Sequence, residues 1–93
     1  MKFISVGYGN IVSAERVISV ATASSAPAKR LIQDAKDCSC CIDCTNGRKT
    51  KSVIVMDSSH VVLSSLHTST ILARLRAEDG MEDDDEELME EGN

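Results

Sequence analysis

Four cysteines within seven residues are the side chains of this chain best suited to chemistry with a metal or an oxidant. They are Cys38, Cys40, Cys41 and Cys44. Thiolates bind soft metals, and the spacing of the last two matches half of a zinc knuckle. A matching second half is missing, and adjacent residues on a strand point to opposite faces. The pattern favours reduced thiols in a connecting loop with no metal or cofactor, and a metal-binding or redox-responsive protein is the alternative.

A second feature is a cluster of three cations, Arg48, Lys49 and Lys51, that follows an Asn-Gly pair. Asn46 and Gly47 tolerate the positive φ of both central residues of a type I′ turn, which predicts a β-hairpin that reverses there. Cations on a rigid turn, with threonine and serine hydroxyls between them, suit the phosphates of a nucleic-acid backbone. The alternative is a charged hairpin end that contacts only solvent.

Catalytic arrangements are sparse in this sequence. The two histidines, His60 and His67, lie in or near predicted turns, and the sequence places neither beside a cysteine or a carboxylate. The glycines on either side of Tyr8 lack the remainder of a phosphate-binding loop, so a plain turn is expected there. We therefore expect a protein that is not an enzyme and has no small-molecule substrate.

The charge of the chain divides after residue 77. The whole chain has a net charge of −5, but residues 1–77 hold all ten Lys and Arg residues and five acids, whereas residues 78–93 hold ten acids and no base. We interpret 1–77 as one basic folded domain and 78–93 as an acidic disordered tail, because the tail has little apolar surface to offset its ordering entropy. The tail either competes with nucleic acid for the basic surface or only increases solubility.

The short apolar run near the N-terminus does not resemble a signal peptide, and no stretch approaches the roughly 18 apolar residues of a membrane span. Closely spaced cysteines make a poor disulfide framework, which suits a reducing compartment. We expect a cytoplasmic protein without membrane contact. A folded part of 77 residues is marginal in size, so association between copies is expected to complete its core.

The apolar pattern predicts an α+β fold, with two helices and a twisted, mostly antiparallel sheet. Runs rich in β-branched residues predict strands over 2–6, 11–23 with an interruption near Ala14, 51–56 and 61–63. Serine N-caps and Pro27 predict a helix from about 25 to 36.

A second helix is predicted from Thr68 or Ser69. In this helix Ile71, Leu72 and Leu75 are expected to be buried, and Arg74 and Arg76 are expected near its C-terminus, where cations suit the dipole.

Several ordered blocks, which together span about residues 2–75, match a known pattern. They are Phe3-Ile4-x-Val6-Gly7-Tyr8-Gly9-Asn10-x-Val12-Ser13-Ala14, Ser25-Ala26-Pro27-x-Lys29-Arg30-x-Ile32-Gln33-Asp34-Ala35, Thr45-x-Gly47-Arg48-Lys49-Thr50 and Val53-Ile54-x-Met56-Asp57-Ser58-x-His60-Val61. They resemble the RemA family of bacterial extracellular matrix regulatory proteins. The cysteine cluster and the acidic tail depart from the family pattern.

The resemblance implies a transcriptional regulator of matrix and biofilm genes that binds double-stranded DNA as a ring-shaped homo-oligomer. The family's DNA-contacting arginines match Arg16 and Arg48, and Lys49 stands where the family has a second arginine. Lysine keeps the charge but lacks the bidentate fork. With Lys51, these residues form the predicted DNA site, in which Arg16 is the companion of the turn. Pro27 matches a position tied to function in the family.

A different class of function remains open beside DNA binding. In a non-DNA oligomeric scaffold, the basic residues would pair with acids of neighbouring subunits. DNA binding that weakens steeply with salt would separate the two, because each neutralised phosphate releases counterions.

Overall fold

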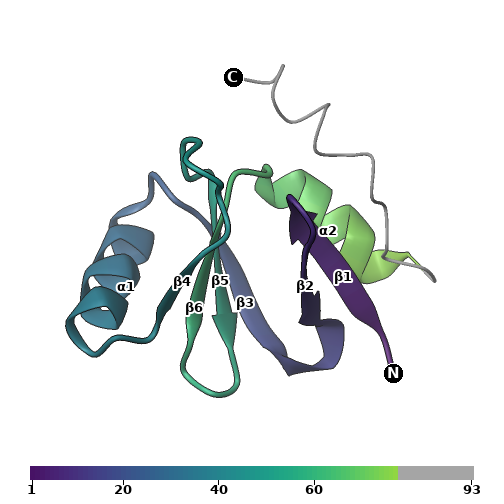
Figure 1. The fold of residues 1–93 in the computed structure, drawn as a ribbon, viewed down its shortest axis with the longest axis horizontal. Coiled ribbons are helices and arrows are strands. Elements are labelled where there is room, and N and C mark those ends of the chain that lie inside the picture. Colours follow the sequence, from purple (N-terminus) through teal and green to yellow (C-terminus); the bar gives the residue numbers. More distant parts are fainter. Residues whose placement is uncertain (78–93) are drawn as a thin grey trace.

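The structure is a computed structural model that describes residues 1–77, and the predicted acidic tail lies outside this part. The elements, in chain order, are β1 (Phe3–Gly7), β2 (Asn10–Ser13), a 3₁₀ turn η1 (Ala14–Arg16), β3 (Val17–Thr22), α1 (Ala26–Asp37), β4 (Cys41–Asp43), β5 (Ser52–Met56), β6 (Val61–Ser64) and α2 (Thr68–Arg76). Figure 1 shows the α+β arrangement that the apolar pattern predicted, with the expected interruption between β2 and β3.

The strands form two sheets, a β1–β2 hairpin and a four-stranded sheet in the order β3-β5-β6-β4. β3, β5 and β6 are antiparallel neighbours, as predicted, but β4 runs parallel to β6. The prediction of one mostly antiparallel sheet is therefore correct only in part. A parallel pair needs a crossover connection, and here the β4–β5 and β5–β6 connections together bring β6 back beside β4.

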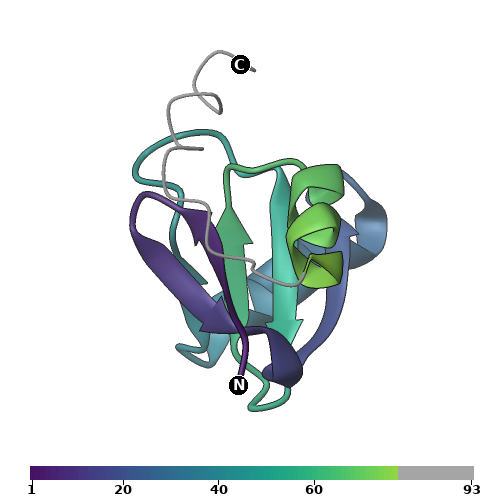
Figure 2. The same cartoon turned by 90° about the vertical axis from the view of Figure 1, so that its right-hand side faces the viewer.

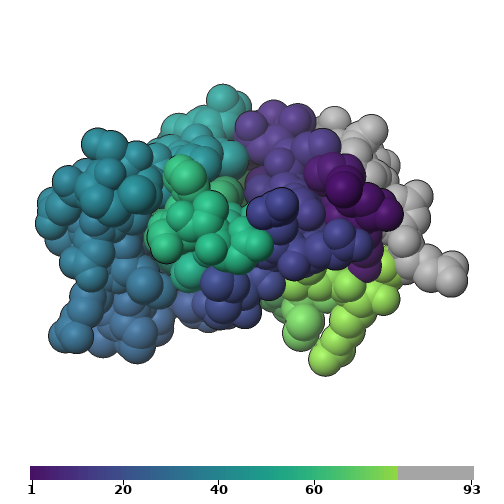
Figure 3. Space-filling model, turned by 90° about the horizontal axis from the view of Figure 1, so that it is seen from below, coloured from purple at the N-terminus to yellow at the C-terminus, as the bar shows by residue number. Residues whose placement is uncertain are grey.

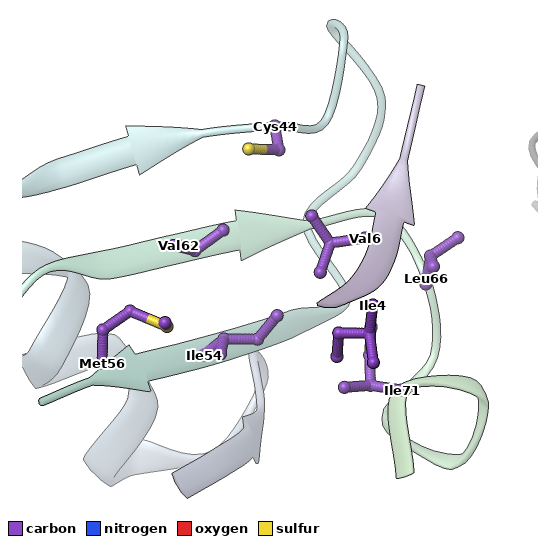
Figure 4. Packing of buried hydrophobic residues seen from close by; sticks show 8 residues of the cluster. All are labelled: Ile4, Val6, Cys44, Ile54, Met56, Val62, Leu66 and Ile71. Carbon is purple, nitrogen blue, oxygen red and sulfur yellow. The ribbon is translucent and has the colours of Figure 1, made fainter. Parts of the chain in front are cut away.

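The four-stranded sheet is covered on both faces. Successive residues of β5 belong to different core clusters: Val53 packs with Ala28 and Ala35 of α1, whereas Ile54 packs with Ile4 of β1 and Ile71 of α2. Figure 2 shows α2 and the β1–β2 hairpin on the near side of the sheet, and Figure 4 shows the cluster between them. β5 is therefore the central strand that its continuous apolar run predicted.

The turn at Asn46 and Gly47 is present, but the predicted hairpin around it is wrong. Both residues have positive φ, 55° and 81°, and the N–H of Arg48 donates to the carbonyl of Thr45 at 3.0 Å. The flanking strands β4 and β5 do not pair, since β6 lies between them and pairs with both. An Asn-Gly pair specifies a local chain reversal. The order of the strands depends instead on which apolar segment pairs with the strands on either side of the turn.

The first helix has the predicted start. The hydroxyl of Ser25 caps it by accepting a hydrogen bond from the N–H of Ala28 at 3.2 Å, and Pro27 lies in the first turn. Proline is tolerated there because its missing N–H would have no partner within the helix. Its role in function stays a prediction.

The second helix buries the predicted face only in part: Ile71 is buried and Leu75 packs against the core, as expected, but Leu72 does not. Leu72 is 45% exposed, and Arg74, which was expected to serve the helix dipole, is only 4% exposed. The guanidinium of Arg74 donates to the carbonyl of Ser5 in β1 at 2.8 Å, so the helix faces β1 through Ile71 and Arg74. The ammonium of Lys2 instead donates to the last carbonyls of the helix. Within residues 1–77, no helix is long and apolar enough to cross a bilayer.

Candidate nucleic-acid interface

The predicted DNA-contacting residues lie at opposite ends of the four-stranded sheet. Val17 of β3 faces Met56 of β5 at one end, and Thr22 faces Ser52 at the other. Arg16 directly precedes the first of these pairs, and the cationic turn precedes the second. β5 has five residues, so the two groups are separated by about 17 Å at roughly 3.4 Å per residue. The structure does not bring Arg16 and the turn together in one subunit.

The cleft end, as we name it, contains the cationic turn and a cleft of about 220 Å³ beside it. The cleft is lined by the end of β3, the segment before β5 and the residue before α2, namely Thr22, Ala23, Ser24, Lys49, Thr50, Lys51 and His67. In the part of the chain that the structure describes, these lining residues include no acid. Ammonium, imidazole and hydroxyl groups are donors that suit phosphate oxygens.

Two side chains at the cleft come from segments far apart in the sequence. The Nζ atom of Lys51 lies 3.5 Å from Nε2 of His67. The backbone of Lys51 is held on both sides, because its N–H donates to Ser64 at 2.8 Å and its carbonyl accepts from Ala23 at 3.0 Å. The base of this side chain is therefore part of the sheet, while its tip reaches the cleft.

The turn itself is anchored by an acid outside the cleft. The carboxylate of Asp43 accepts hydrogen bonds from the hydroxyl of Thr45 at 2.6 Å and from its N–H at 2.9 Å. These two bonds lower the pKa of Asp43 below its ordinary value, and the bond from the hydroxyl has the larger effect. The carbonyl of Thr45 in turn accepts from the N–H of Arg48. A chain of local hydrogen bonds thus holds the exposed Arg48 and Lys49 in a fixed reversal.

Both helices begin at the cleft end, where their dipoles add positive potential. Ser25 precedes α1 and donates its N–H to Thr22 at the end of β3, and His67 precedes α2. Figure 1 shows the two helix starts and the 44–51 loop on the same side of the molecule. The potential at this end therefore comes from backbone as well as from side chains.

The hairpin end, as we name the opposite end, contains Arg16 and the β5–β6 turn. Figure 3 views this end directly and shows the β5–β6 turn beside the η1 segment. Arg16 ends η1 and does not lie inside a strand as the sequence suggested. Its side chain is 67% exposed and lies 3.5 Å from the carboxylate of Asp57, which is 47% exposed. The carboxylate beside Arg16 therefore comes from the β5–β6 turn. An exposed pair of this kind contributes about 0–1 kcal/mol.

Sequence reasoning missed three residues at the cleft. Thr22 and Ser24 were interpreted only as parts of a strand end and a helix start, and His67 was weighed only as a catalytic candidate. No local signal connects them to the cationic turn, because they meet it through the pairing of β3 with β5 and through the start of α2.

The cysteines do not form a metal site among residues 1–77, where no group of three or more His, Cys, Asp or Glu side chains is arranged to hold an ion. All four are free thiols. The prediction of a connecting loop is wrong for Cys41, which lies in β4 because this segment pairs with β6, and Cys44 is buried in the core cluster of Figure 4. Burial raises the pKa of both thiols. The cluster is thus divided between core and surface.

The chain is similar to known regulatory proteins along nearly its whole length. A protein named extracellular matrix regulatory protein A, from Bacillus subtilis, is 47% identical over 92 residues, which are 99% of this chain and 96% of that one. A regulatory protein of Geobacillus kaustophilus is 52% identical over 79 residues, which are 85% of this chain and 91% of that one. Residues 3–75 match the family described as extracellular matrix regulatory protein A-like. The chain therefore belongs to the RemA-like family.

Proposed function

We propose that this chain is a cytoplasmic regulator of transcription that binds double-stranded DNA as a ring-shaped homo-oligomer and controls matrix or biofilm genes. The observation that carries this proposal is the cleft end, where Lys49, Lys51 and His67 line one cleft beside the exposed Arg48. The names of the relatives support a regulatory function, and the name extracellular matrix regulatory protein A supports matrix genes as the target.

The chemistry of the cleft end suits the DNA backbone better than the base edges. Its donors are mobile ammonium groups, hydroxyls and one guanidinium on a turn, which fix position on phosphates without reading sequence. Specificity would then come from the shape and deformability of the duplex, because the free energy needed to fit the duplex to a curved protein surface depends on its sequence. We therefore expect binding that weakens steeply with salt, with a log-log slope of about −0.9 for each phosphate neutralised.

Assembly into a ring would compensate for the few contacts that one subunit offers to DNA. Each subunit holds two cationic sites about 17 Å apart, which is about five base-pair steps along a duplex. A few phosphate contacts bind weakly, but repeated subunits make later contacts intramolecular and add roughly 10²–10⁴ in avidity. The two edge strands of the described sheet, β3 and β4, carry the exposed Ile18 and Ile42. Open edges with apolar side chains suit contact with further copies.

The test is a titration of duplex DNA with the full chain at several salt concentrations, followed by anisotropy, with the assembly mass measured by light scattering on the same samples. We expect an assembly of several subunits whose affinity for DNA falls steeply with salt. A shortened chain that ends at Ala77 is titrated in parallel. Binding by the shortened chain alone would show that the acidic tail inhibits binding, rather than that the folded part has no affinity for DNA. No binding by either chain at low salt would overturn the proposal, and salt-dependent disassembly without DNA binding would favour the scaffold.

A further inference from the structure

Two of the four cysteines are held as a close pair at the turn that joins α1 to β4. The Sγ atoms of Cys38 and Cys40 are 2.9 Å apart. Ser39 between them has a φ of 62°, in the left-handed region, which folds the three residues into a tight turn. The pair lies outside the cleft described above, whose lining residues include neither cysteine.

The backbone of this turn is tied to the last turn of the helix. The N–H of Cys38 donates to Asp34 at 3.2 Å, and the N–H of Cys40 donates to Ala35 at 2.8 Å. On the other side, the carbonyl of Cys40 accepts from Val61 at 2.9 Å. Both ends of the three-residue turn are thus fixed, and the closeness of the two sulfurs follows from the backbone.

The remaining two thiols are placed differently. Cys41 is half-buried in β4, where it is paired with β6, and Cys44 is buried in the core cluster of Figure 4. Cys38 is exposed and Cys40 is half-buried. An oxidant from solvent therefore meets Cys38 most easily, and the sulfur nearest to it belongs to Cys40.

We propose that Cys38 and Cys40 are a redox-active thiol pair, which peroxides oxidise to an intramolecular disulfide. The Cys38 thiolate attacks one oxygen of hydrogen peroxide, the O–O bond breaks, and the other oxygen leaves as water after protonation. This step forms a sulfenic acid on Cys38. The sulfur of Cys40 then attacks the sulfur of Cys38, the S–O bond breaks, and a second water leaves with the proton of Cys40. Two thiols and one peroxide thus become one disulfide and two waters.

The environment of the pair sets the order of these steps. The hydrogen bond with Cys38 raises the pKa of Cys40, and burial raises it further. Cys40 therefore keeps its proton to a higher pH than an ordinary thiol and is the poorer first nucleophile. Its position 2.9 Å from the other sulfur suits the second step, in which it resolves the sulfenic acid before further oxidation.

The test uses the full, reduced chain treated with one equivalent of hydrogen peroxide while folded, with intact mass as one readout, and then alkylated with N-ethylmaleimide in denaturant, which exposes the buried Cys44 as well. We expect the mass to fall by two hydrogen atoms and the number of alkylated thiols to fall from four to two. A dithiol reductant should restore all four. Four reactive thiols after peroxide, a disulfide between subunits, or sulfinic acid as the main product would each overturn the proposal.

Variants identify the pair, because cleavage after Lys36 and Arg48 leaves all four cysteines on one tryptic peptide. Cys38→Ser and Cys40→Ser should each abolish the loss of two hydrogens, whereas Cys41→Ser, the matched control, should keep it. Circular dichroism checks that each variant is folded, and Cys41→Ala replaces the control if the serine is not tolerated. A disulfide that persists in Cys38→Ser, or that disappears in the folded Cys41 variant, would assign the chemistry to another pair and contradict ours.

Discussion

The two ends of the four-stranded sheet carry cations in different ways. At the cleft end, Lys49 and Lys51 of the segment before β5 lie beside His67 before α2, and the anchoring acid, Asp43, is outside the cleft. At the hairpin end, Arg16 stands beside Asp57, whose carboxylate lies 3.5 Å away. The first arrangement concentrates positive charge, whereas the second partly neutralises it. We infer that the cleft end dominates attraction to a polyanion and that the hairpin end contributes a second, weaker contact.

The distance between the two ends also bears on the proposed DNA binding, because it limits the contacts that one copy of the chain offers to a duplex. The ends are separated by the length of β5, so a single phosphate cannot contact both. In an assembly, the hairpin end of one copy and the cleft end of another could meet the same stretch of duplex. Substitutions at each end test whether the cleft end contributes more to DNA affinity than the hairpin end.

The largest effect is expected from Arg48→Ala at the cleft end. Loss of a charge-assisted contact is worth about 1.5–3 kcal/mol, so the affinity for duplex DNA should fall by roughly 10- to 100-fold, with a shallower salt slope. Anisotropy titrations measure both quantities. Lys29→Ala, on the exposed surface of α1, is the matched control for loss of one positive charge. An equal loss in the control would mean that only net charge matters.

A smaller loss, about tenfold or less, is expected from Arg16→Ala, because its charge is already shared with Asp57. The same titration measures it, and light scattering should find an unchanged assembly mass. A loss larger than that of Arg48→Ala would reverse our ranking of the two ends. Dissociation of the assembly would reassign Arg16 to the contact between subunits.

Asp57→Asn should change the DNA affinity in the opposite direction and raise it. Removing this carboxylate frees the guanidinium of Arg16 and removes a negative charge from the hairpin end, so DNA affinity should rise by about two- to fivefold, in line with the worth of an exposed ion pair. In the double variant with Arg16→Ala most of the gain should vanish. A full gain in the double variant would instead show a long-range charge effect.

The smallest effect on DNA is expected from Asp43→Asn, which weakens the anchor of the turn but leaves every cation in place. Its clearer effect is on stability. Because the folded pKa of Asp43 is lowered, the ionised carboxylate stabilises the fold above its ordinary pKa of 3.8, and this stabilisation is lost as the pH falls through the lower, folded value.

Urea denaturation should therefore find Asp43→Asn less stable than the unmodified chain at pH 7, with the difference shrinking at pH 3. Asp34→Asn, on α1, serves as the control for removal of one acid. A difference that stays constant between the two pH values would show that the hydrogen bonds to Thr45 do not depend on ionisation.

Much of the local structure was predictable from the residues. The Asn46-Gly47 reversal follows from two residues that accept positive φ, and the start of α1 follows from a serine cap and Pro27 in the first turn. The central position of β5 follows from a strand that is apolar on both faces. These features depend on a few neighbouring residues, so a single sequence is sufficient for them.

Two of the errors concern contacts between segments that are distant along the chain. Arg74 was assigned to the helix end, but its guanidinium donates a hydrogen bond to the carbonyl of Ser5 in β1. Leu72 was assigned to the core, but the position of β1 turns that side of α2 to the surface. The apolar periodicity identifies α2 as an amphipathic helix. It does not decide which of two neighbouring helix faces is buried when the strand that packs against the helix is unknown.

The sequence by itself determined both helices and every strand except β4, the chain reversal at Asn46-Gly47, the separation of basic and acidic parts, and the family. Only the tertiary structure decided that β6 lies between β4 and β5, that His67 joins Lys51 at one cleft, and that Arg16 lies at the far end of the sheet. The physical reason is that propensity and turn chemistry act over a few residues, whereas strand order and the meeting of side chains depend on which apolar faces are buried together.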